Sequence, residues 1–253
     1  MSSWVTAVVV TISLLGSAFV GARLRRVLPQ HHLSEESKET VKLGIGLVAT
    51  LVALLLSLLV ASAKSAFDTK SSEIEQIAAQ VLQLDRTLRQ YGPQAVPARQ
   101  ALRDLIAARV KRGWGSADLA DEAMYLARVN LIDSIQGRIH ALAPADDQQR
   151  WLRTQALTTV STLSQARWLL VEQSGSTVST PLVVLMVGWL MVIFVTLGLF
   201  APKNGTVMAV ILLCALSVST AVLILLELDR PFSGLLQLSQ EPLRTALKIL
   251  DVP

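Results

Sequence analysis

The chain has 253 residues, of which 52% are hydrophobic and only 17% charged, and its mean hydropathy is +0.50. This composition is too apolar for an ordinary soluble domain of this length, so it indicates a membrane protein. The net charge is only +4 and is spread along the chain without a run of like charges, so nothing indicates binding to nucleic acid.

Four stretches contain no charged residue, and each has about the 20 residues that a helix needs to cross the hydrocarbon core of a bilayer. They are residues 4–22, 43–63, 181–201 and 205–226. Arginines follow the first stretch rather than precede it, unlike the arrangement in a secretory signal. We therefore predict four transmembrane helices.

The polar stretch between the second and third of these windows is patterned as helix. From Ile74 to Tyr91, apolar residues recur at spacings of three and four, which places them on one side of a helix. No helix-breaking residue separates this pattern from the second window. One continuous helix is predicted from about Leu43 to Tyr91, ending at Gly92 and Pro93.

Three further helices are expected in the same layer. One begins near Pro97 and ends by Gly113. The next spans residues 117–142 with Ser116 as its N-cap, and the last begins near Asp146 and breaks at Gly175. Because each has an apolar stripe that needs a partner, a helical bundle is predicted.

The fold class is therefore an all-α membrane protein with a soluble helical bundle between the second and third of four transmembrane helices. Residues 1–63 form the first transmembrane hairpin, and residues 64–178 form the bundle, continuous with the second transmembrane helix. Residues 179–228 form the second hairpin, and residues 229–253 a C-terminal tail. Lys and Arg near the membrane are almost equally divided between its two sides, so the charges do not orient the chain.

Small and polar residues follow one side of the second transmembrane helix at spacings of three and four. They are Thr50, Ala53, Ser57 and Ala61, and Lys64, Ser65 and Asp68 continue this side beyond the window. One interpretation is a pore wall, where small side chains leave room for ions and Lys64 attracts anions to the mouth. The other is close helix packing, which small residues at this spacing permit within membranes. On the residues alone, packing is favoured.

The rest of the sequence contains few residues or motifs that indicate transport coupling, catalysis or metal binding. With no acidic or basic residue in the four windows, a proton-driven pump or a voltage sensor is disfavoured. No phosphate loop, nucleophile turn or metal-ligand spacing occurs, so we expect neither an enzyme nor a bound metal or cofactor.

Glu227 and Asp229 at the end of the fourth helix form either a cation or gating site or a solvated helix end with Asp229 paired to Arg230. The solvated end is favoured, because calcium needs more oxygen ligands.

Short motifs next to the membrane resemble those of a known family. Ala66-Phe67-Asp68, after the second membrane helix, resembles the Ala-Tyr-Asp of bacterial bestrophins, and Arg230-Pro231-Phe232, after the fourth, resembles their Asn-Pro-Phe-Gly. Together with Leu84-Asp85-Arg86 and Tyr91-Gly92-Pro93, they make the chain similar, over nearly its whole length, to the bestrophin-like family of bacterial membrane proteins. That family is itself distantly similar to bestrophin anion channels.

The resemblance implies a homo-oligomer of five subunits in the inner (plasma) membrane of a bacterium, with the soluble layer in the cytoplasm. Small anions would pass through a central pore lined by the second helix, at Thr50, Ala53, Ser57, Ala61, Lys64 and Ser65. The family motif at the membrane boundary would comprise Phe67, Asp68, Glu227, Asp229, Arg230, Pro231 and Phe232.

The chain also departs from the bestrophin pattern. Ala53, Ser57 and Ala61 are small where bestrophins have bulky apolar neck residues, and no acidic run follows Phe232. A hydrophobic gate of the bestrophin kind and a calcium clasp are therefore not expected. The alternative function is a non-conducting, membrane-anchored helical scaffold or partner-binding protein, suggested by the long amphipathic layer.

Overall fold

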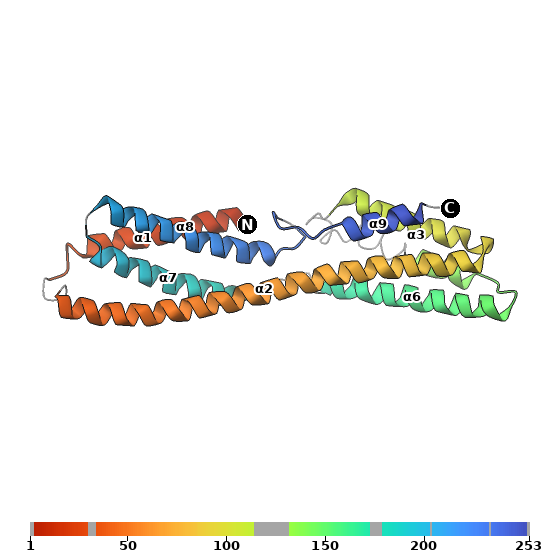
Figure 1. Cartoon of the computed structure of the whole chain (residues 1–253), viewed down its shortest axis with the longest axis horizontal. Helices are drawn as coiled ribbons and strands as arrows, with labels where there is room; N and C mark the ends of the chain where they lie inside the picture. The colour runs from red at the N-terminus through yellow and green to blue at the C-terminus, as the bar shows by residue number, and fades with distance from the viewer. Residues whose placement is uncertain are drawn as a thin grey trace. The chain divides into compact units, whose positions relative to one another are not determined.

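Every regular element in the described part of the chain is a helix, as the computed structural model in Figure 1 shows. The structure describes residues 3–29, 34–113, 132–172, 179–202, 204–232 and 234–251, without the side chains of residues 112 and 167–172. The predicted all-α class is confirmed over these residues.

Four helices are long and apolar enough to cross a membrane: α1 (Ser3–Leu24), α2 (Glu35–Tyr91), α7 (Thr180–Phe200) and α8 (Gly205–Leu228). The ends of α1, α7 and α8 lie within two residues of the predicted windows. The prediction of four membrane-spanning helices is thus supported by both length and composition.

Helix α2 begins at Glu35, so the predicted start near Leu43 is wrong. The Ser37 N–H donates to Ser34 Oγ over 3.3 Å, which caps the helix, and Glu35 and Glu36 in the first turn complement the helix dipole. These local interactions extend the helix through a polar segment that hydropathy alone assigns to a loop. At the other end α2 stops at Tyr91 as predicted, because Gly92 adopts a φ of 110°.

The chain divides into two compact units. The membrane unit comprises Met1–Ala66 and Ser176–Arg230, and the bundle unit comprises Phe67–Gly175 and Pro231–Pro253. Helix α2 contributes its first part to the membrane unit and its second part to the bundle unit.

Within the membrane unit, α1 packs against both α7 and α8. The contact with α7 is close enough to bring the two backbones together. A Cβ added to Gly198 would lie 1.9 Å from the Ala18 carbonyl oxygen, and one added to Gly21 would lie 1.9 Å from that of Val195. Small residues at a helix crossing allow this approach in membranes, where packing rather than the hydrophobic effect holds helices together.

The bundle unit has one apolar core, to which the second part of α2 contributes Ile74, Val81, Leu84 and Leu88. Pro93–Ala95 form a short 3₁₀ turn (η2) that leads into α3 (Val96–Arg112). Helix α3 has a proline in its first turn and ends before Gly113, whose φ is 73°, in agreement with the predicted helix from about Pro97 to Gly113.

The other two predicted helices of this unit are described in part. Residues 132–140 are helical, whereas Ser116 and residues 117–131 lie outside the described residues. Helix α6 (Asp147–Glu172) begins as predicted, with Asp146 Oδ1 accepting a 2.6 Å hydrogen bond from the Gln149 N–H. Gln149 Nε2 also donates to the Tyr91 carbonyl oxygen over 3.1 Å, so the start of α6 is tied to the end of α2.

The C-terminal tail contains a helix that is not among the predicted elements. Helix α9 (Glu241–Leu250) buries Leu243, Ala246 and Leu250 and packs against α3. Beyond it, Asp251 accepts a hydrogen bond from Arg103 Nε, and this bond and the charge of Asp251 raise the pKa of Arg103. The tail thus completes the core of the bundle unit.

Asp85 of the Leu84-Asp85-Arg86 motif is a buried carboxylate that joins α2 to α3. It accepts a hydrogen bond of 2.8 Å from Arg99 Nε and one of 3.2 Å from Arg89 Nη2. Its own side chain is only 5% exposed, whereas that of Arg99 is 21% exposed. The motif therefore has a structural role in holding the α2–α3 hairpin.

Asp85→Asn is expected to lower the free energy of unfolding by about 2–3 kcal/mol, because it leaves the mostly covered Arg99 guanidinium without its counter-charge. Thermal and denaturant unfolding of the purified protein in detergent would measure this loss. Asp104→Asn, at an exposed position on α3, is the matched control and should stay within about 0.5 kcal/mol of the wild type. Equal stability of the two variants would contradict a structural role for Asp85.

Candidate functional site

The predicted pore-lining side of α2 is exposed in the chain. Thr50, Ala53, Ser57 and Ala61 all have exposed side chains. The Thr50 hydroxyl donates to the Gly46 carbonyl oxygen over 2.9 Å, so its proton is directed to the helix backbone and its oxygen lone pairs remain outside. We call these four residues the small-residue face.

The opposite side of α2 is the one that packs within the chain. Val52, Leu59 and Ala63 are 4%, 6% and 0% exposed. At about 100° per residue they lie roughly 120–180° around the helix from Thr50 and Ser57. The chain therefore packs α2 through this opposite side and leaves the small-residue face uncovered.

Large apolar side chains adjoin the small-residue face. Leu43, Leu47, Leu54 and Leu58 are 63–78% exposed. The chain thus presents two kinds of surface on α2, one of bulky leucines and one of small and hydroxyl-bearing side chains. The leucines suit lipid or a neighbouring helix, whereas the small side chains leave space beside the helix.

Helix α2 carries the small-residue face beyond the membrane window without a break. Lys64, Ser65 and Asp68 are exposed, and each takes part in polar interactions. Phe67 instead points into the bundle unit, where it packs against the apolar core. The Phe67-Asp68 motif thus has one side chain in the core and one on the surface.

The end of α8 differs from the favoured sequence interpretation. Glu227 is only 3% exposed, so a fully solvated helix end is wrong at this residue. Asp229 is partly buried and Arg230 exposed, and all three residues have interaction partners. Pro231 is buried and Phe232 packs against the core of the bundle unit, a tertiary environment that the local sequence does not reveal.

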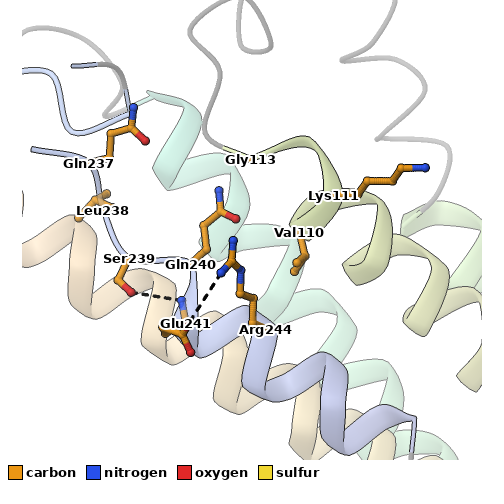
Figure 2. Close-up of a pocket in the computed structure, with 9 residues that line it drawn as sticks. All are labelled: Val110, Lys111, Gly113, Gln237, Leu238, Ser239, Gln240, Glu241 and Arg244. Atoms are coloured by element: carbon orange, nitrogen blue, oxygen red, sulfur yellow. Dashed lines mark hydrogen bonds and ion pairs between the residues drawn. The ribbon is translucent and has the colours of Figure 1, made fainter. Parts of the chain in front are cut away.

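The bundle unit also has an open pocket of about 520 Å³ between the end of α3 and the start of α9 (Figure 2). Glu241 lines this pocket; its N–H donates to Ser239 Oγ over 3.2 Å, and its carboxylate lies 3.7 Å from Arg244. In Figure 2 the Lys111 side chain extends away from Arg244. The charged groups do not converge on a common point, so we assign no ligand to this pocket.

Comparison with known families shows which family the chain resembles over most of its length. A model of the Bestrophin-like domain matches residues 7–243. The chain belongs to the Bestrophin-like family. The match runs from α1 to the first turn of α9 and so covers both units of this bestrophin-like protein, which confirms the resemblance inferred from the short motifs. No curated protein and no solved structure matches the chain significantly.

Proposed function

We propose that this bestrophin-like protein is a homo-oligomeric channel of five subunits in the inner membrane of a bacterium, with its bundle unit in the cytoplasm. Small anions would pass passively along a central axis lined by the small-residue face of α2, with Lys64 and Ser65 at the mouth. Membership of the family supports the channel class. The arrangement of α2 supports the choice of lining.

The exposure of the small-residue face is the observation that carries this proposal. Its four side chains are exposed, and they lie opposite the residues through which α2 packs on its own chain. In an oligomer around an axis, this face can point inward while the adjoining leucines contact lipid or the next subunit. Small side chains then leave an open path, and the Thr50 oxygen provides a polar wall.

Anion preference is assigned to Lys64 rather than to the hydroxyl groups. The Thr50 proton is used within the helix, so this residue offers an acceptor and no donor to a passing ion. Lys64 is the first cation on the same side of α2 after the window, although Asp68 lies one turn further and reduces its field. The balance of these two charges would decide the selectivity.

Reversal potentials in bilayers with a KCl gradient test the proposal directly. The wild type is expected to reverse near the chloride equilibrium potential, and Lys64→Gln to shift toward the potassium potential because it removes the cation from the mouth. Lys248→Gln, at an exposed position on α9, is the control and should not shift. An unchanged reversal potential in Lys64→Gln would place the selectivity elsewhere. A folded oligomer that carries no current would favour the non-conducting scaffold.

A further inference from the structure

The segment that follows the fourth transmembrane helix forms a closed loop fixed at both ends. The Leu238 N–H donates to the Pro231 carbonyl oxygen over 3.0 Å, which closes the loop. Pro231 is buried, Leu238 is only 3% exposed, and Phe232 packs against the core of the bundle unit. Both ends of the loop are therefore held against the bundle unit.

Two adjacent leucines stand exposed between these fixed ends. Leu235 is 64% exposed and Leu236 is 43% exposed. Gly234 precedes them with a φ of 129°, and its carbonyl oxygen accepts a 3.1 Å hydrogen bond from Gln237 Nε2. The Gln237 side chain is thus bonded to the backbone that precedes the leucine pair, while the side chains of the pair are exposed. Keeping two neighbouring leucines in water is unfavourable.

The position of the pair in the chain limits what can cover it. Helix α8 ends at Leu228, seven residues before Leu235. Seven residues span at most about 25 Å when fully extended. The turn at Asp229 and Arg230, with bonds to the Leu225 and Glu227 carbonyl oxygens, shortens this reach. The leucines are therefore tethered within reach of the headgroup layer into which α8 emerges, which is roughly 5–8 Å thick on each side of the hydrocarbon core.

We propose that Leu235 and Leu236 insert into the boundary between headgroups and acyl chains of the membrane that α8 spans. The loop would act as an interfacial anchor through which the lipid bilayer contacts the bundle unit directly. Burial of two leucines at this depth follows the way in which interfacial apolar side chains bind membranes. This inference does not depend on ion conduction and holds equally for a channel and for a scaffold.

Spin labels at the two leucines provide the test. In a Cys214→Ser background, Leu235→Cys and Leu236→Cys are labelled with a nitroxide and reconstituted as the full chain into phosphatidylcholine vesicles. Collisions with oxygen, which concentrates in hydrocarbon, are compared with collisions with a water-soluble nickel chelate. At both positions oxygen is expected to relax the label more than the nickel chelate.

Trp151→Cys provides the matched control, since Trp151 is an apolar residue with 63% exposure at the start of α6. That region is tied to Tyr91, which lies 27 residues, or about 40 Å, along α2 from Lys64. The nickel chelate should dominate there. Dominance of the nickel chelate at Leu235 and Leu236 as well would place the loop in water and overturn the proposal. Protection from both reagents would overturn it too, by placing the leucines inside a protein interface.

Discussion

Gly198→Ala is expected to lower the free energy of unfolding by about 3 kcal/mol or more, because the new methyl group has no space between α1 and α7. Its Cβ would lie 1.9 Å from the Ala18 carbonyl oxygen and 2.7 Å from the Ala18 carbonyl carbon. These are backbone atoms, so no side-chain rotation can relieve the overlap. The two helices must move apart, and the packing of α1 with α7 is lost along the crossing.

Another glycine of α7, Gly188, provides a matched control for this substitution. A Cβ on Gly188 would meet no atom within 4 Å, so Gly188→Ala should be neutral or slightly stabilising through its higher helix propensity. Gly21→Ala approaches the same crossing from α1 and should match Gly198→Ala. Thermal unfolding in detergent, followed by size-exclusion chromatography, measures all three variants. Similar melting temperatures for Gly198→Ala and Gly188→Ala would show that the helices do not pack this closely.

The elements that the sequence predicts correctly are those determined by residues close together in the chain. A run of about 20 apolar residues forms a spanning helix whatever surrounds it, so α1, α7 and α8 are found to within two residues. The end of α2 is equally local, because Gly92 and Pro93 interrupt the helix at that point in any context. The start of α2 is missed because hydropathy does not detect the cap at Ser34.

The features that were missed depend on tertiary contacts. Helix α9 is short, and three of its residues become buried only against the rest of the bundle unit. Glu227 belongs to a motif identified from the sequence, yet its burial follows from the packing around the end of α8. For the candidate pore, spacing identifies Thr50, Ala53, Ser57 and Ala61 as one face. Only the fold shows that α2 packs through the opposite side and leaves this face uncovered.

Ser57→Trp is expected to abolish most of the chloride flux if the small-residue face lines the pore. Ser57 lies in the middle of this face, where an indole from each subunit would fill the space near the axis. The serine is exposed within the chain, so the substitution should not disturb the subunit's own fold. Flux into vesicles containing a known amount of folded oligomer measures the effect.

Ser62→Trp separates a blocked pore from a damaged helix. Ser62 is an exposed serine on the same helix, five residues from Ser57 and therefore turned about 140° away from it. The two substitutions add the same side chain to the same helix, about 7.5 Å apart along its axis and on different sides of it. Flux should persist in Ser62→Trp and be lost in Ser57→Trp. The reverse result would move the pore to the other side of α2. Flux that persists equally in both variants would remove α2 from the conduction path. A pore lined by this helix cannot accept an indole from every subunit without narrowing.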